Sequence, residues 1–104
     1  MMLKVDTEFR RGIFFIRLKG RIDNAADLDW INNIVDIFGI RCVVLNIENL
    51  YNIDIQTIDY ISRYNDKILK SKRYLLLCDA NDRLSRLFVS IPKINCEIEA
   101  FTLF

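Results

Sequence analysis

Three carboxylates in the middle of the chain are the residues best suited to acid–base chemistry: Glu48, Asp54 and Asp59. Two carboxylates can divide the roles of general acid and general base when both point into one pocket. On a helix, Asp54 and Asp59 would point roughly 140° apart, since each residue turns the helix by about 100°. We therefore interpret Asp54 as a helix N-cap and Asp59 as a solvated helix residue, rather than as a catalytic pair.

The cysteines offer the other familiar source of chemistry. Cys42, Cys78 and Cys96 are an odd number without Cys-x-x-Cys spacing, and two of them lie in or beside apolar runs, where a thiol packs as a small hydrophobic group. The chain has no histidine, so it lacks the usual base for a cysteine nucleophile and the commonest zinc ligand. Its glycines stand apart and form no known phosphate loop. We expect no enzyme, no cofactor and no bound metal.

The composition is that of one globular domain. A length of 104 residues, with 52% hydrophobic and 28% charged residues, provides a core but no room for a second domain. The net charge of +1 gives no general attraction to nucleic acid or to an anionic membrane. The apolar runs are far shorter than the roughly 20 residues of a membrane span. The first residues lead directly into a strand-like alternation, so we expect no signal peptide. We expect a single cytoplasmic domain over residues 1–104, with no nucleic-acid partner and no direct membrane insertion.

The central carboxylates follow a stretch with the pattern of a buried strand. Cys42–Ile47 is short, β-branched and almost wholly apolar, as expected for a strand covered on both faces. Asp54 then precedes apolar residues at helical spacing, which predicts a helix over Ile55–Ser71.

Similar patterns predict the other elements. A turn at Arg10-Arg11-Gly12 joins the first two strands into a hairpin, and the first strand is expected at a sheet edge. Asn24 and Asn81 are the expected N-caps of the first and third helices. The remaining predicted elements are strands Leu3–Phe9, Ile13–Lys19, Tyr74–Cys78 and Glu97–Phe101, and helices Ala25–Phe38 and Asp82–Ile91. This order predicts an α/β fold, with helices flanking a mixed, mainly parallel five-stranded sheet that begins with an antiparallel hairpin.

The junction between the central strand and the second helix resembles that of the STAS domain family, the fold of bacterial anti-sigma-factor antagonists and of sulfate-transporter tails. The family has a strand of the form hhLDL, then a loop, then Asp-Ser-Ser-Gly-Leu at a helix start. Val43–Ile47 is similar to the strand, Asp54–Ile58 to the helix start, and Gly20–Asp23 to the family's Gly-Glu-Leu-Asp. The resemblance covers roughly Leu3 to Phe101 and implies a STAS-like single domain.

The chain departs from the family at the residues of its phosphorylation switch. The first serine, which the regulated members phosphorylate, is Ile55 here; the second serine is Gln56 and the glycine is Thr57. A phosphate on Thr57 would lie near the positive end of the helix, but packing or backbone bonding is the commoner role of a threonine there. The resemblance therefore implies the scaffold of the family without its usual switch.

The resemblance also implies a non-enzymatic protein-protein interaction module. In the family the partner, often a serine kinase or another regulator, docks around the loop and the start of the second helix. The partner implied here is a kinase-like anti-sigma factor or, for a structural subunit, a component of a membrane transport or motor assembly. A small-ligand or nucleotide-binding module is a third alternative. The matching partner-binding positions are Tyr51, Asn52, Ile53, Asp54, Ile55, Gln56, Thr57 and Tyr60.

The C-terminal residues carry a further expectation. Many STAS chains continue into another helix, whereas this sequence stops at Phe104. We expect Phe101, Leu103 and Phe104 to be partly uncovered or turned toward another chain, because a large exposed apolar patch is unusual on a monomer. This predicts a homodimer or the capture of a partner at that end.

Overall fold

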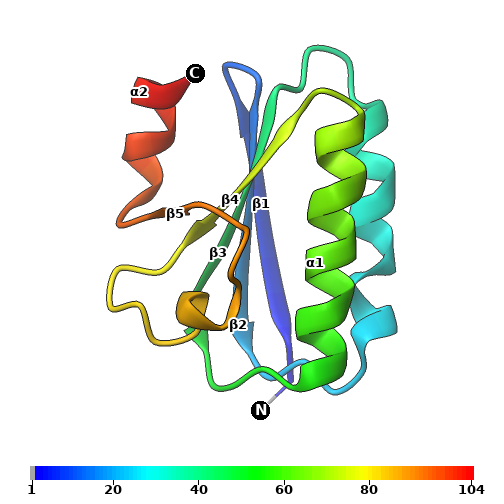
Figure 1. Cartoon of the computed structure of the whole chain (residues 1–104), viewed down its shortest axis with the longest axis vertical. Coiled ribbons are helices and arrows are strands. Elements are labelled where there is room, and N and C mark those ends of the chain that lie inside the picture. The colour runs from blue at the N-terminus through cyan, green and yellow to red at the C-terminus, as the bar shows by residue number, and fades with distance from the viewer. Residues whose placement is uncertain (1) are drawn as a thin grey trace.

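The computed structural model describes residues 2–104, which form a five-stranded sheet with helical segments on both faces (Figure 1). The strand order is β1-β2-β3-β4-β5; β1 pairs antiparallel with β2, and the other neighbours are parallel. This confirms the predicted architecture, including the edge position of the first strand. The elements are β1 (Lys4–Arg10), β2 (Ile13–Gly20), η1 (Ala25–Asp36), β3 (Cys42–Leu50), α1 (Ile55–Lys70), β4 (Tyr74–Cys78), η2 (Ser85–Leu87), β5 (Lys93–Ile94), η3 (Glu97–Glu99) and α2 (Ala100–Leu103).

Two apolar layers lie on opposite faces of the sheet. The larger one is covered by η1 and α1, and the smaller one by the C-terminal segment that contains η3 and α2 (Figure 1). Alternate residues of β2, β3 and β4 contribute to the two layers, as the two-residue period of a strand requires. In β2, for example, Ile16 belongs to the larger layer and Phe15 to the smaller one.

Strand β3 holds the centre of the sheet, as its apolar sequence predicts. It pairs with β2 on one side and β4 on the other. Its residues from Cys42 to Leu45 are all buried, so each contributes to one of the two layers. The strand runs to Leu50, three residues beyond the predicted end, and it delivers the chain to the start of α1.

Helix α1 begins and ends close to the predicted limits. Asp54 is its N-cap and Ser71 its C-cap. Its buried stripe includes Ile61 and Ile68, which pack on the larger layer. The Tyr64 hydroxyl donates a hydrogen bond to the backbone oxygen of Ile31 at 2.9 Å, which ties α1 to η1.

The predicted first helix is present as the 3-10 helix η1. Asn24 caps it as predicted, accepting a hydrogen bond from the Ala26 backbone N–H at 3.0 Å. A 3-10 helix has three residues per turn, and the buried side chains recur at that interval. Because η1 ends at Asp36, the predicted helix end at Phe38 is wrong. Helical spacing from Ile31 and Val35 predicted that Phe38 is buried, whereas it lies beyond η1 and is 98% exposed. The buried residues of η1 are Leu28, Ile31 and Ile34.

The helix predicted over Asp82–Ile91 is wrong, since the segment is a loop that contains only the short 3-10 turn η2. The buried Asp79 carboxylate accepts hydrogen bonds from the backbone N–H groups of Leu84 and Ser85, both at 2.8 Å. These bonds fold the loop back on the end of β4, and the expected cap Asn81 is exposed without a helix to cap. The helix-like spacing instead marks residues that point from the loop into the larger layer: Leu84, Phe88 and Ile91.

The strand predicted over Glu97–Phe101 is also wrong. The fifth strand is the two-residue β5, directly after Pro92, and the segment that follows it is helical. Ala100 is 0% exposed, and Phe101 packs beside it on the smaller layer. Alternation over so few positions does not distinguish a strand from a helical turn with one buried side.

The aromatic residues near the C-terminus are partly uncovered, as expected. Phe101 and Phe104 are half-buried against the smaller layer, whereas Leu103 is 58% exposed. The ring centroid of Phe101 lies 5.6 Å from that of Phe15, and the ring centroid of Phe104 lies 5.1 Å from that of Tyr74. Self-association at this end stays a prediction.

Candidate functional site

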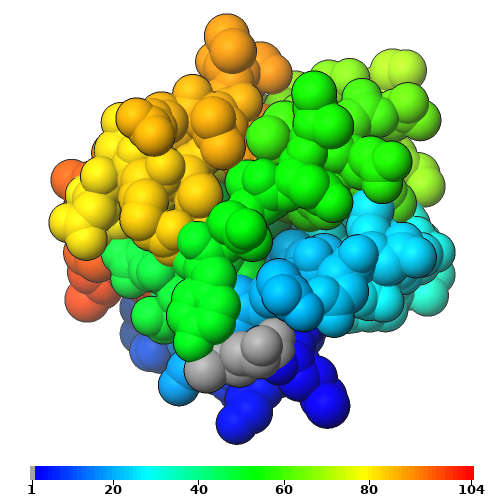
Figure 2. Space-filling view, turned by 90° about the horizontal axis from the view of Figure 1, so that it is seen from below, coloured from blue at the N-terminus to red at the C-terminus, as the bar shows by residue number. Residues whose placement is uncertain are grey.

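The β3–α1 junction lies at the end of the molecule where the parallel strands finish. Seen from that end, the junction runs between the loop that follows β4 and the chain leading into η1 (Figure 2). In α/β sheets, the carboxyl ends of the strands are where binding residues on loops come together. The candidate site therefore comprises this junction and the loops beside it.

Asp54 fixes the start of α1. Its carboxylate accepts a hydrogen bond from the Thr57 backbone N–H at 2.8 Å, which satisfies one of the free donors of the first turn. The Thr57 side chain, and then this N–H, lower the pKa of the Asp54 carboxyl. Asp54 is therefore ionised near neutral pH and is committed to a structural role.

Thr57 lies under this cap. It is 1% exposed, and its Oγ1 is the buried side-chain polar atom of residues 2–104 that has no hydrogen-bond partner. Although Oγ1 lies outside hydrogen-bond geometry, the Thr57 side chain is close enough to the Asp54 carboxylate to lower its pKa. A buried hydroxyl without a partner costs about 1–3 kcal/mol.

Replacing Thr57 with valine is expected to leave the free energy of unfolding unchanged or to raise it by up to about 1 kcal/mol. Valine keeps the shape and removes the unpaired hydroxyl, although it is a slightly poorer residue in a helix. Thermal denaturation of the two proteins measures the difference. Thr57→Ala is the control, and its lost methyl group should lower stability. A clear loss for Thr57→Val would show that the hydroxyl has a stabilising partner.

The outer side of the junction is apolar. Ile55 is 80% exposed and Tyr51 is 56% exposed. Asn52, Asp54 and Gln56 are exposed around them, so the predicted contact positions reach the surface together. Exposed single apolar residues are ordinary, but a β-branched side chain this exposed at a helix start contributes nothing to the core.

Three predicted contact positions turn inward instead. Ile53 is half-buried against the larger layer, and Thr57 is buried. Tyr60 faces η1: its hydroxyl donates to the Asp29 carboxylate at 2.6 Å and accepts from the Asn32 side-chain amide at 3.0 Å. Burial and the Asp29 carboxylate raise the pKa of Tyr60. These residues position the junction rather than form its surface.

The loop after β4 is fastened to the junction by residues that the sequence did not indicate. The Arg83 guanidinium donates to the backbone oxygens of Leu50 and, at 2.8 Å, of Tyr51. The Glu48 carboxylate accepts a hydrogen bond from the Ala80 backbone N–H at 2.8 Å. The two loops therefore form one surface.

This loop adds apolar groups of its own. Val89 is 101% exposed and Leu87 is 42% exposed. Both residues fall in the segment that was predicted as a helix. Helical spacing with Leu84 and Ile91 placed Leu87 on the buried side of that helix, and this prediction is wrong because the segment is a loop. Exposure in an irregular loop has no periodic pattern, so sequence analysis could not find these residues.

The structure separates the three central carboxylates. Glu48 binds the loop after β4, Asp54 caps α1, and Asp59 pairs with Arg63 at 2.7 Å on the exposed side of α1. Since each carboxylate serves a different local contact, the geometry provides no acid–base pair. This agrees with the interpretation of Asp54 and Asp59 from the sequence.

The two buried cysteines are poorly suited to nucleophilic chemistry. Cys42 and Cys78 are buried and free, and burial raises the pKa of each thiol to about 12. Cys96 is free and exposed. Within residues 2–104, no group of three or more Cys, Asp or Glu side chains could hold a metal ion. No helix of that range is long and apolar enough to cross a membrane.

Solved structures of other proteins share this architecture. The structure of the anti-sigma factor antagonist SpoIIAA in its unphosphorylated form matches with a TM-score of 0.76, over 97% of this chain and 94% of that chain, at 13% sequence identity. The fold is that of SpoIIAA. The STAS-like scaffold expected from the strand and helix-start residues is thereby confirmed.

A second solved structure is similar over a smaller part. A crystal structure of Mglu matches with a TM-score of 0.60 and 23% identity, covering 76% of this chain and 20% of that one. No protein-family model matches the chain, and no curated protein matches it significantly. With identities this low, the likeness to SpoIIAA concerns the fold and assigns no role to a residue.

Proposed function

We propose that the chain is a non-enzymatic protein-protein interaction module of the anti-sigma-factor-antagonist type. Its contact surface is the exposed part of the β3–α1 junction together with the fastened loop. The observation that carries this proposal is Ile55, a large apolar side chain 80% exposed at the helix start. A few apolar anchors dominate most protein interfaces, and Tyr51 and Val89 extend the anchor here.

The module is not switched by phosphate at the usual helix start. Ile55 and Gln56 have no hydroxyl, and Thr57 is buried beneath the Asp54 cap. Incubation with an anti-sigma-type kinase and ATP is expected to leave residues 54–57 unmodified, because a kinase must reach an accessible hydroxyl. Peptide mapping by mass spectrometry checks this. Phosphate on Thr57 would contradict the prediction and would restore the switch.

The partner is a kinase-like anti-sigma factor or a subunit of a larger assembly. An apolar anchor without a phosphate switch is suited to a permanent contact. This favours the second kind of partner, a subunit of a membrane transport or motor complex in which this chain is a structural component. Salt has little effect on the affinity of a permanent contact that buries apolar surface. It lowers the affinity of a transient contact that depends on attraction between charges. Salt dependence therefore distinguishes the two kinds of partner.

Affinity capture from the source cells tests the proposal. The whole chain is the bait, washed at low and at high salt, and the bound proteins are quantified by mass spectrometry. We expect one major partner that is lost with Ile55→Asp and retained with Phe38→Asp. Phe38 is the matched control because it is 98% exposed at the opposite end of the sheet. Equal capture by both variants would contradict the proposed surface.

A further inference from the structure

A surface cavity of about 350 Å³ lies between the turn of the β1–β2 hairpin and the C-terminal segment. It is separate from the β3–α1 junction, because the hairpin turn is at the other end of β2. One side of the cavity consists of strand residues, including Phe15 and Arg17, and the other consists of Glu97, Ile98 and Phe101. Its volume is within the roughly 300–1,000 Å³ typical of small-molecule pockets.

The turn end of the cavity is basic. The guanidinium carbons of Arg10 and Arg11 lie 5.3 and 5.9 Å from the centroid of the same ring, that of Phe101. Arg10 has one ion pair, with Glu8 at 3.4 Å. Arg11 has no ion pair with any residue of the described range 2–104. Two like charges over one ring repel each other, so an anion between them would be stabilised.

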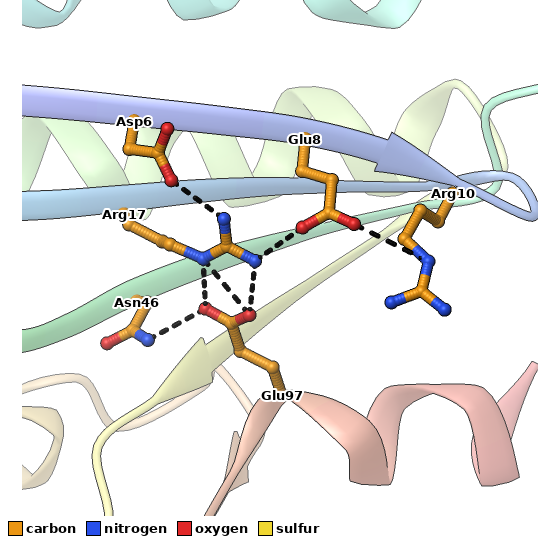
Figure 3. A network of polar contacts seen from close by, with 6 residues as sticks. All are labelled: Asp6, Glu8, Arg10, Arg17, Asn46 and Glu97. Atoms are coloured by element: carbon orange, nitrogen blue, oxygen red, sulfur yellow. Dashed lines mark hydrogen bonds and ion pairs between the residues drawn. The ribbon is translucent and has the colours of Figure 1, made fainter.

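The acidic groups of the cavity are already engaged. Glu8 and Glu97 bind the Arg17 guanidinium at 2.7 and 2.8 Å, and Glu97 also accepts from the Asn46 amide at 2.8 Å (Figure 3). Asp6 completes this cluster from outside the cavity, at 2.7 Å from Arg17. The cluster therefore fixes the wall that Glu97 provides. It leaves Arg11 available to a ligand, together with Arg10, whose contact with Glu8 is longer at 3.4 Å.

The floor of the cavity is aromatic. Phe15 is 2% exposed and its ring centroid is 5.6 Å from that of Phe101, with the planes inclined by 52°. Ile98, 70% exposed, forms part of the rim. A flat apolar group can pack on such a floor, since aromatic pairs prefer offset or tilted arrangements with centroids about 4.5–7 Å apart.

We infer that this cavity binds a small aromatic carboxylate. Its carboxylate pairs with Arg10 and Arg11, for which a planar carboxylate is a matching partner, and its ring packs beside Phe101 and Ile98, with Phe15 buried beneath. This function is independent of the partner surface at the β3–α1 junction.

Titration of the isotope-labelled chain by NMR tests the inference with three probes of one shape. Benzoate is the anion, benzamide the neutral analogue and benzylammonium the cation. We expect saturable shifts at Arg11 and Phe101 with benzoate, and binding at least tenfold weaker with the other two. Equal binding of benzylammonium and benzoate would overturn the inference. So would the lack of a saturable shift at about 10 mM benzoate, a concentration that nearly fills a site with a Kd of about 1 mM.

Matched charge variants complete the test. Arg11→Gln is expected to weaken benzoate binding at least tenfold and to leave the melting temperature within a few degrees of the wild type. Arg11 has no ion pair to lose within residues 2–104, and its contact with the Phe101 ring is made by an exposed side chain. Arg63→Gln removes the same charge from α1, on the other face of the sheet, and should not change benzoate binding. Equal weakening by the two variants would show a general charge effect and would overturn the site.

Discussion

Replacing Ile55 with aspartate is expected to lower the affinity for the partner at least thirtyfold while the fold persists. The side chain is 80% exposed, so the substitution buries no charge. A carboxylate in the first turn of a helix is favoured by the helix dipole by about 0.3–1 kcal/mol, which offsets part of its repulsion from Asp54. Loss of a central apolar anchor costs about 2 kcal/mol or more, which corresponds to the thirtyfold change.

Two measurements separate binding from stability in this experiment. Calorimetric unfolding should give melting temperatures within a few degrees for the wild type and Ile55→Asp, and a titration with the captured partner should give the change in Kd. Phe38→Asp makes the same chemical change at the opposite end of the sheet and should bind as the wild type does. Unchanged affinity of Ile55→Asp would remove the junction as the contact surface.

Replacing Arg17 with methionine is expected to lower the melting temperature by about 10 °C. The arginine holds three carboxylates, those of Asp6, Glu8 and Glu97, at 2.7 to 2.8 Å, and its removal leaves them facing one another. Its side chain is 34% exposed, so solvent screens part of the interaction. We expect a loss of about 2 kcal/mol, which shifts the melting temperature of a domain of this size by roughly 8–16 °C.

The pH dependence identifies the cause of this loss. The Arg17 hydrogen bond is the main reason that the pKa of the Glu97 carboxyl lies below its usual value. A lowered pKa gives stability that is present above the ordinary glutamate pKa of about 4.3 and is lost as the pH falls through the folded-state value. The difference between the wild type and Arg17→Met should therefore narrow in acid. A difference that is constant with pH would point to lost packing instead.

Arg63→Met is the control for Arg17→Met. Arg63 forms a single ion pair with Asp59 on α1, where its side chain is 79% exposed. Such a pair contributes about 0.3–0.5 kcal/mol, so the variant should unfold within a few degrees of the wild type. An equal loss in both variants would mean that the Arg17 cluster has no special effect.

Sequence patterns predicted most of the sheet because β3 and its neighbours carry strong local signals. An apolar run such as Cys42–Ile47 has few alternatives to a buried strand. The two elements after β4 were predicted wrongly for one physical reason. Their conformations depend on distant contacts, such as Arg17 with Glu97, eighty positions apart, and on the Asp79 side chain, which bonds the loop backbone in place of a helix.

The candidate site was predictable to a similar extent. The position of Asp54 as N-cap follows from local sequence, and so does the absence of a hydroxyl at Ile55. The inward direction of Thr57 and Tyr60 depends on how α1 packs against the sheet and η1, which the sequence of α1 alone does not determine. The contribution of Val89 depends on the loop that Arg83 fastens, and that contact links segments far apart in the chain.

The segment that closes the second face of the sheet is synthesised after every strand of the sheet. Before residues 97–104 have folded onto that face, the hairpin, η1, β3, α1 and β4 can already form the larger layer. Phe15, Val44 and Leu76 would then face solvent on a nascent chain, and exposed apolar sheet surface of this kind invites aggregation or chaperone binding. A chain cleaved after Asn95 therefore keeps the residues of its larger core, whereas its second sheet face stays open.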